Sequence, residues 1–234
     1  MKNRIVKRKI AVVCILLIVC MNYIYTQNCS EGYTFYAELP ETTTIIQGDS
    51  CLSNIDLTAL DDIIIDNNLD ANYYDDPTDV GNQTWKDGRL IGLVASYSPN
   101  GSNGVNEQLT VLPERFGDLD ELTFLFLEWN SLTSLPNSFS QLISLANLTI
   151  NNNWLTSIPE DFGNLNKLHF LDLGYNKLTS IPESICQLED LQYLYLFNNE
   201  LGTINPIPDI GHALKKHKVY FHSDAVQFIG KGKL

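Results

Sequence analysis

The chain has 234 residues, with 15 Lys or Arg residues against 28 Asp or Glu residues, which gives a formal net charge of −13 at pH 7. A chain this acidic is a poor partner for nucleic acid or for an anionic membrane surface, because both carry negative charge.

The segment 1–26 is typical of a secretory signal peptide. Basic residues lie within positions 2–9, and an apolar run follows over residues 10–21. This run is shorter than the roughly 20 residues that cross a membrane as a helix. We therefore predict that residues 1–26 are cleaved, that the mature chain is not stably inserted in a membrane, and that the protein is secreted or held at the cell surface. An uncleaved anchor and a lipoprotein remain as alternatives, since residues 17–20 resemble a bacterial lipobox from which Val19 departs.

Residues 27–88 do not repeat, and we predict that they form a helical N-terminal cap over the first repeat that follows. A helix is expected over residues 54–68, with Asn54 or Asp56 at its N-cap. Its apolar residues have helical spacing at Ile55, Leu57, Leu60, Ile63 and Ile64.

Three cysteines remain after cleavage, namely Cys29, Cys51 and Cys186. Export permits disulfide formation, and three cysteines allow three single pairings. We predict the pair Cys29–Cys51 because both residues lie in the segment before the repeats.

A 23-residue repeat dominates residues 89–204. Four copies of the phrase L-x-x-L-x-L-x-x-N-x-L begin at Leu122, Leu145, Leu168 and Leu191, and an incomplete copy begins at Leu90. Residues 96–108 exceed what the repeat needs and are rich in Gly, Asn and Ser, so they are predicted to form a loop. Each copy is one strand plus a return segment that cannot bury its apolar face alone. The repeated asparagines are expected to be buried and bonded to the backbone: Asn130, Asn153, Asn176 and Asn199.

These phrases, such as residues 168–182, resemble those of secreted or extracellular leucine-rich repeat proteins in the 23-residue class that contains Leu-Pro. The resemblance covers about residues 90–204. It implies an α/β solenoid, a horseshoe with a concave parallel β-sheet and short irregular or helical convex segments. It also implies binding of a protein or another ligand rather than catalysis. The pattern ends after Ile204, so residues 205–234 are predicted to be a degenerate C-terminal cap or tail, with Tyr220 among the apolar residues that cover the open core.

The side chains between the core leucines are predicted to point outward from the concave sheet, in columns that recur once per repeat. Eight of them are aromatic, and aromatic anchors in large exposed apolar patches are typical of binding sites. The alternative is that aromatic residues simply suit strands. The predicted ligand-binding residues are Phe124, Phe126, Glu128, Trp129, Asn147, Thr149, Phe170, Asp172, Tyr175, Tyr193, Tyr195 and Phe197.

The sequence therefore indicates an extracellular module that binds a protein or peptide on its concave face. The alternatives are a carbohydrate-binding module, with the glycan stacked on Trp129 and the Tyr rings, and a structural adhesion or surface-coat module without a defined soluble ligand. No enzyme, cofactor or metal site is expected. The four histidines have no metal-ligand spacing and no aligned Ser or Cys partner. The aspartates at positions 70, 75, 76 and 79 lack the alternating spacing of a calcium loop.

Overall fold

The computed structural model describes residues 29–98, 104–201 and 219–222. Its strands are β1 (Tyr33–Phe35), β2 (Thr43–Gln47), β3 (Cys51–Ser53), β4 (Asn82–Lys86), β5 (Arg89–Val94), β6 (Phe124–Phe126), β7 (Asn147–Thr149), β8 (Phe170–Asp172), β9 (Tyr193–Tyr195) and β10 (Tyr220–His222). Its helices are the α-helix α2 (Asn54–Asn67) and the short 3-10 helices η1 (Pro77–Asp79), η2 (Glu114–Asp118), η3 (Asn137–Gln141), η4 (Phe162–Asn164) and η5 (Glu183–Gln187).

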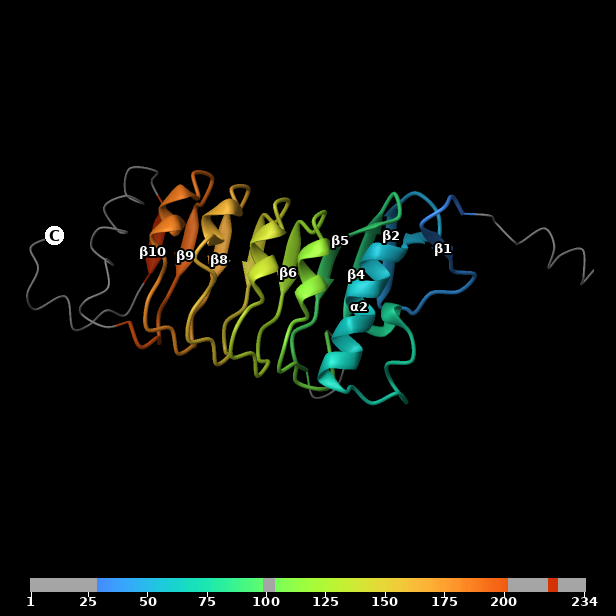
Figure 1. Cartoon of the computed structure of the whole chain (residues 1–234), viewed down its shortest axis with the longest axis horizontal. Coiled ribbons are helices and arrows are strands. Elements are labelled where there is room, and N and C mark those ends of the chain that lie inside the picture. The colour runs from blue at the N-terminus through green and yellow to red at the C-terminus, as the bar shows by residue number, and fades with distance from the viewer. Residues whose placement is uncertain (1–28, 99–103, 202–218, 223–234) are drawn as a thin grey trace, which may run out of the picture.

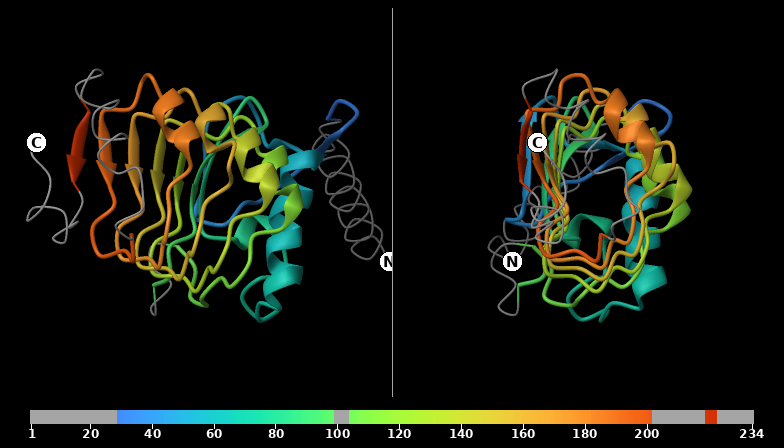
Figure 2. Two further views of the ribbon diagram at one scale, coloured as in Figure 1. Left: turned by 60° about the vertical axis from the view of Figure 1, so that its left-hand side comes forward. Right: turned by 90° about the vertical axis from the view of Figure 1, so that its left-hand side faces the viewer.

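Most of the strands form one long sheet that runs along the molecule (Figure 1). Within the described residues its order is β10-β9-β8-β7-β6-β5-β4-β2, and all neighbouring pairs are parallel except β4 and β5, which are antiparallel. Each coil passes from the sheet to a 3-10 helix on the opposite wall and returns, so that the coils enclose the core (Figure 2). This arrangement confirms the predicted solenoid with a parallel sheet.

The core is built from the repeated apolar positions. Leucines of the strand phrase, such as Leu148, point inward and are fully buried. On the opposite wall the rings of Phe116, Phe139 and Phe162 stack in a row, with centroids 6.0 and 6.2 Å apart. Because neighbouring coils bury one another, truncating one core leucine to Ala should destabilise the solenoid by about 2–5 kcal/mol.

The repeated asparagines are bonded to the backbone, which confirms the structural role predicted for them. Asn130, Asn153 and Asn176 are buried, whereas Asn199 is half-buried. The Oδ1 atom of Asn153 accepts the N–H of Leu132 at 3.0 Å, and its Nδ2 atom donates to the carbonyl oxygens of Leu127 and Ile150 at 2.9 and 3.2 Å. The same bonds recur at Asn130, Asn176 and Asn199. Each side chain thus ties its own coil to the coil before it.

Helix α2 lies beside η2 of the first coil, at the N-terminal end of the solenoid (Figure 1). It buries Leu57, Leu60 and Ile63 in the common core. The predicted N-cap was wrong. The hydroxyl of Ser53 accepts the N–H of Asp56, because the helix begins at residue 54 and a cap precedes the first helical residue.

The predicted disulfide is confirmed, with Cys29 joined to Cys51. A second attachment is the carboxylate of Asp56, which is fully buried. It accepts bonds from Nε and Nη2 of Arg89 at 2.9 and 3.0 Å and from the N–H of Leu90 at 2.8 Å. Burial raises the pKa of Asp56, and the bonds from Arg89 and Leu90 oppose that shift. The pair fixes α2 to β5.

The predicted signal peptide and most of residues 205–234 lie outside the described residues. The ends of the predicted loop over residues 96–108 are described and are joined by a parallel bridge between Tyr97 and Val105. Among the residues that the structure describes, no helix is both long and apolar enough to span a bilayer.

Candidate functional site

The structure brings the predicted site residues together on the outer face of the sheet, called here the sheet face. Two of the predicted columns lie in register across β6 to β9: Phe124, Asn147, Phe170 and Tyr193, then Phe126, Thr149, Asp172 and Tyr195. The other predicted residues, Glu128, Trp129, Tyr175 and Phe197, lie just after the strands. The predicted adjacency of the columns is therefore confirmed.

The aromatic residues of the sheet face form two groups separated by a polar strip. On β6, the rings of Phe124 and Phe126 lie with their centroids 5.8 Å apart. The next strand, β7, contributes Asn147 and Thr149 instead. Beyond it lies a larger group, called here the aromatic cluster, whose neighbouring ring centroids are 5.1–6.2 Å apart: Phe170, Tyr175, Tyr193, Tyr195, Phe197, Tyr220 and His222.

Strand β10 contributes two residues to this cluster that the sequence did not place there. Tyr220 lies in register with Tyr193, and His222 with Tyr195. The prediction that Tyr220 helps to cover the open core was wrong, because its ring lies on the sheet face and is 55% exposed. The alternation Tyr-x-His matches Tyr-x-Tyr of β9, but it falls outside the regular spacing of the repeat, which hid the match.

Several rings are half-buried rather than fully open to water. The ring of Phe197 lies over Gly174, where an added β-carbon would be only 2.9 Å from its Cζ atom. Glycine at this position allows the ring to lie close to the backbone of the neighbouring coil. The rings of Trp129, Tyr175 and Tyr193 are the most open of the predicted set, at 60, 50 and 44% exposure.

Trp129 and Tyr175 also have an uncommon backbone conformation. They belong to a column of residues that follow the strands, together with Asn152 and Asn198, and all four have a left-handed φ of 52–62°. Asparagine adopts this conformation readily, whereas a bulky residue there costs on the order of 1 kcal/mol. A preference of aromatic residues for strands cannot account for Trp129 and Tyr175, because both lie outside strands.

A small hydrogen-bond network surrounds Asp172 of β8, at the border between the polar strip and the aromatic cluster. The Oδ2 atom of Asp172 accepts a bond from Nδ2 of Asn151 at 2.8 Å, and Oδ1 accepts the N–H of Gly174 at 2.9 Å. Nearby in the same region of the sheet face, the carboxylate of Glu128 accepts a bond from the hydroxyl of Ser96. These contacts hold both carboxylates in place at the border of the aromatic groups.

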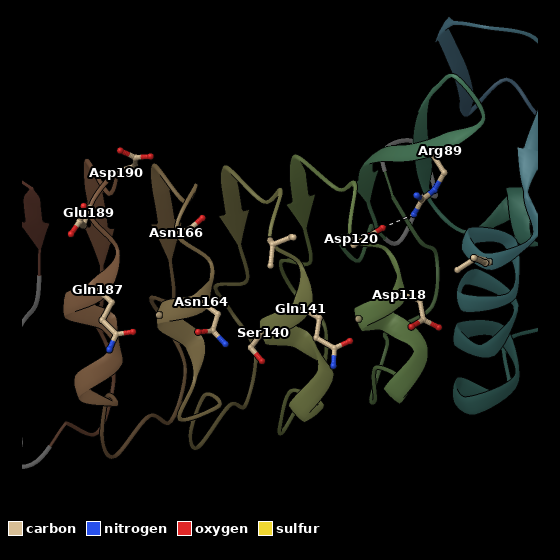
Figure 3. Close-up of a pocket in the computed structure, with 14 residues that line it drawn as sticks. Arg89, Asp118, Asp120, Ser140, Gln141, Asn164, Asn166, Gln187, Glu189 and Asp190 are labelled. Atoms are coloured by element: carbon tan, nitrogen blue, oxygen red, sulfur yellow. Dashed lines mark hydrogen bonds and ion pairs between the residues drawn. The ribbon is translucent and has the colours of Figure 1, made fainter.

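A second surface lies between the 3-10 helices and the starts of the strands (Figure 3). It is an open groove of about 1210 Å³ lined by two columns that recur once per repeat, namely Asp118, Gln141, Asn164 and Gln187, then Asp120, Ile143, Asn166 and Glu189. Arg89 also lines this groove, and its guanidinium group is paired with Asp56 and Asp120. The periodicity of the repeat could have identified this groove, but the sequence analysis followed only the strand positions.

A third regular surface is formed by two rows of hydroxyl side chains on the return segments, called here the hydroxyl rows. Thr133, Thr156 and Thr179 form one row, and Ser134, Ser157 and Ser180 form the other; all six are exposed. The backbone N–H of Thr156 donates to the carbonyl of Thr133 at 3.4 Å, and that of Thr179 donates to Thr156 at 3.3 Å. The rows therefore follow the coil spacing of about 4.8 Å.

Two of the four aspartates in the loop after α2, Asp76 and Asp79, take part in local capping. The carboxylate of Asp76 accepts the N–H of Thr78 at 2.9 Å, and that of Asp79 accepts the N–H of Asp76 at 3.1 Å. In the part of the chain that the structure describes, no three His, Cys, Asp or Glu side chains are grouped to hold a metal ion.

Known proteins resemble this chain in its repeats. Residues 143–201 match the family described as leucine rich repeat. Together with the parallel strand ladder, this match decides the fold. The chain has a leucine-rich repeat fold. Solenoids of this kind offer extended surfaces for binding.

Two solved structures are similar to this chain. The crystal structure of a plant ice-binding protein is 30% identical, with a TM-score of 0.53, and the match covers 64% of this chain and 50% of that one. The crystal structure of PEPR1-AtPEP1 is 26% identical, with a TM-score of 0.49, over 60% of this chain and 19% of that one. The leucine-rich repeat chain thus spans half the length of the first of these structures.

A short match to a curated protein of another kind also occurs. A putative cysteine desulfurase of Bacillus subtilis strain 168 is 64% identical over 31 residues. The match covers 13% of this chain and 8% of that protein. Since so little of the enzyme is represented, the match gives no argument for its activity here.

Proposed function

We propose that this leucine-rich repeat chain is an extracellular module that binds a protein or peptide partner through the sheet face. The predicted ligand-binding residues are the contact surface in this proposal, extended by Tyr220 and His222. Leucine-rich repeat solenoids have a binding architecture, and the Cys29–Cys51 disulfide suits an exported protein.

The observation that carries the proposal is the pair Trp129 and Tyr175. Both rings are at least half exposed, and both residues hold a left-handed backbone that asparagine adopts in the same column. Packing of the core does not require the Trp129 ring, and strand propensity does not apply to either residue. An exposed aromatic residue with a strained backbone is expected at positions where its ring contacts a ligand.

The test separates stability from binding. The mature chain is screened against a peptide array, and the affinity of the strongest peptide is then measured for Trp129→Asn and Tyr175→Asn. Asparagine relieves the backbone strain, so stability should hold or rise by up to about 1 kcal/mol. The affinity should fall by about 2 kcal/mol or more if either ring is a hot spot.

Trp154→Asn is the matched control, because Trp154 is 50% exposed but lies outside the predicted columns, where its ring contacts Lys177. This variant should bind like the parent chain. Unchanged affinity in both Trp129→Asn and Tyr175→Asn would remove the sheet face as the binding surface. A glycan array screened in parallel tests the carbohydrate alternative. If the chain binds to neither array, a structural adhesion or surface-coat role is favoured.

A second function is favoured by the hydroxyl rows. The plant ice-binding protein is a similar solved structure with a TM-score above 0.5. Exposed hydroxyl rows repeating at about 4.8 Å present water with a regular pattern of hydrogen-bond donors and acceptors. In this proposal the return segments, and not the sheet face, contact the ice.

Thermal hysteresis of the mature chain tests this second function. Thr156→Tyr places a bulky side chain in the middle of the rows, where the residue is exposed, and should abolish any effect on ice growth. Lys167→Tyr alters an exposed residue outside the rows and should leave the effect intact. A parent chain without thermal hysteresis would exclude ice binding.

Export is also part of the proposal. Cleavage of residues 1–26 should appear in the intact mass of the secreted chain, and reduction should add the mass of two hydrogens for the Cys29–Cys51 bridge. Retention of residues 1–20 would indicate an anchor or a cytoplasmic protein instead.

A further inference from the structure

The aromatic cluster borders the carboxylate of Asp172. Within the described ranges, no basic residue of the sheet face forms an ion pair with this carboxylate. Asp172 lies in register with Tyr195, whose ring centroid is 5.6 Å from that of Phe170. Each oxygen of Asp172 accepts one hydrogen bond within the chain. A carboxylate offers about four acceptor sites, so both oxygens keep room for a further donor.

The described residues include five Lys or Arg side chains, Lys86, Arg89, Arg115, Lys167 and Lys177, and two histidines, His169 and His222, neither of which forms an ion pair with Asp172. Arg89 pairs with Asp56 and Asp120, Arg115 pairs with Asp62, and the ammonium group of Lys177 lies 4.3 Å from the centroid of Trp154. Lys167 lies in the turn between η4 and β8. Among these residues no ion pair reaches Asp172 or Glu128.

Besides the paired Arg89 of β5 and His222 of β10, Lys86 at the end of β4 is the basic residue that lies in the sheet. Four strand spacings separate β4 from β8, which is about 19 Å. This exceeds the Debye length of about 8 Å at physiological ionic strength, so Lys86 contributes little screening at Asp172.

The net negative charge of the whole chain also favours a cationic ligand. Its 28 Asp or Glu residues outnumber its 15 Lys or Arg residues, and only five Lys or Arg residues lie in the described ranges. An acidic surface of this size raises the local concentration of cationic partners and speeds their association.

The cluster and the carboxylate together match a guanidinium group. Arginine is planar, stacks on aromatic faces and pairs with a carboxylate through two N–H donors. The ring of Tyr195 supplies the stacking surface, the tilted ring of Phe170 lies beside it, and Asp172, in register with Tyr195, supplies the pairing group.

We propose that the aromatic cluster and Asp172 recognise an arginine side chain of an extended peptide. This inference rests on the proposed function and specifies the chemistry of its ligand. The guanidinium plane lies on the ring of Tyr195, and its N–H groups donate to the remaining acceptor sites of Asp172. The ring of Phe170, tilted by 49° from that of Tyr195, contacts the edge of the group.

The test uses a fluorescein-labelled hexapeptide of alternating glycine and arginine, and the same peptide with uncharged citrulline in place of arginine. Fluorescence anisotropy with the mature chain should show affinity for the arginine peptide at least tenfold higher than for the citrulline peptide. Asp172→Asn should weaken binding of the arginine peptide at least fivefold and leave the citrulline peptide unchanged. Asparagine still accepts the N–H of Gly174, so this variant keeps the local backbone.

Asp190→Asn is the matched control, because it changes the net charge equally at an exposed residue that borders the groove and not the aromatic cluster. It should leave both affinities unchanged. Tyr195→Leu should weaken the arginine peptide, whereas Tyr195→Phe keeps the ring and should restore binding. Melting temperatures within the range of the parent chain show that the variants fold.

Three results would overturn the inference: equal affinity for the two peptides, equal losses in Asp172→Asn and Asp190→Asn, or no binding of the arginine peptide. The proposed function is judged separately, since array peptides without arginine that lose affinity in Trp129→Asn would support it in each of these cases.

Discussion

The ring of Phe124 lies directly over Gly92 of the neighbouring strand. A β-carbon added at Gly92 would overlap the Cζ and Cε1 atoms of Phe124. The two residues are paired in the β5–β6 register. The size of the side chain at residue 92 therefore sets the position of an aromatic ring at one end of the sheet face.

Gly92→Ala should turn the Phe124 ring outward with little net change in stability. The backbone at Gly92 is not left-handed, so alanine fits the strand, and the flexible ring can yield. The free energy of unfolding should change by no more than about 1 kcal/mol, because lost ring contacts are offset by the lower entropy of the unfolded chain. In a Phe124→Ala background the same change should be neutral or stabilising. Urea denaturation of the four proteins measures this coupling, and strict additivity would contradict the contact.

Asn153→Ala should destabilise the solenoid much more than a change at an exposed asparagine of the same coil. The variant leaves the N–H of Leu132 and the carbonyl of Leu127 without their buried partner. The expected loss is about 2–4 kcal/mol. Asn147→Ala, at an exposed position of the sheet face, should change stability by about 0.5 kcal/mol or less. Equal losses in urea denaturation would show that the buried ladder is not what distinguishes the two positions.

Arg89→Met should destabilise the attachment of α2 to the solenoid. The variant leaves the fully buried carboxylate of Asp56 without its charged partner, which should cost about 3–5 kcal/mol. Arg115→Met is the control, since Arg115 forms a more exposed pair with Asp62 at 3.3 Å and should cost less than about 1 kcal/mol. The double variant Asp56→Asn with Arg89→Met should recover part of the loss. No recovery in thermal denaturation would point to lost packing of the Arg89 stem instead.

Stability should fall with rising pH between 10 and 12 in a way that depends on Tyr36. Burial and the nearby carboxylate of Asp76 raise the pKa of Tyr36 from 10.0 to about 12. In that interval the unfolded chain releases the phenol proton and the folded chain keeps it, so the contribution present below pH 10 is lost. The difference in unfolding free energy between the parent chain and Tyr36→Phe should therefore change between pH 9 and pH 11.5, in favour of the variant. Parallel pH dependences of the two proteins would show that Tyr36 titrates normally.

The sequence by itself determined the solenoid and the order of its columns. Residues that repeat along the chain stack in successive coils, so the regular spacing places Phe170 beside Tyr193. Successive residues of a strand point to opposite faces, so the same spacing places Leu148 in the core. The same regularity allowed the backbone role of the asparagines to be predicted, and the closeness of Cys29 and Cys51 in the cap allowed their pairing to be predicted.

The tertiary structure decided what has no repeat in the sequence. It placed Tyr220 on the sheet face instead of over the core, because β10 pairs with β9 although it falls outside the regular spacing. It also set the exposure of each ring. The ring of Phe124 packs against Gly92, whereas the ring of Trp129 is exposed. It also showed that Asp172 has no basic partner among the described residues. Such features depend on contacts between side chains of different coils, and a periodic pattern specifies which positions meet but not how the particular side chains at those positions pack.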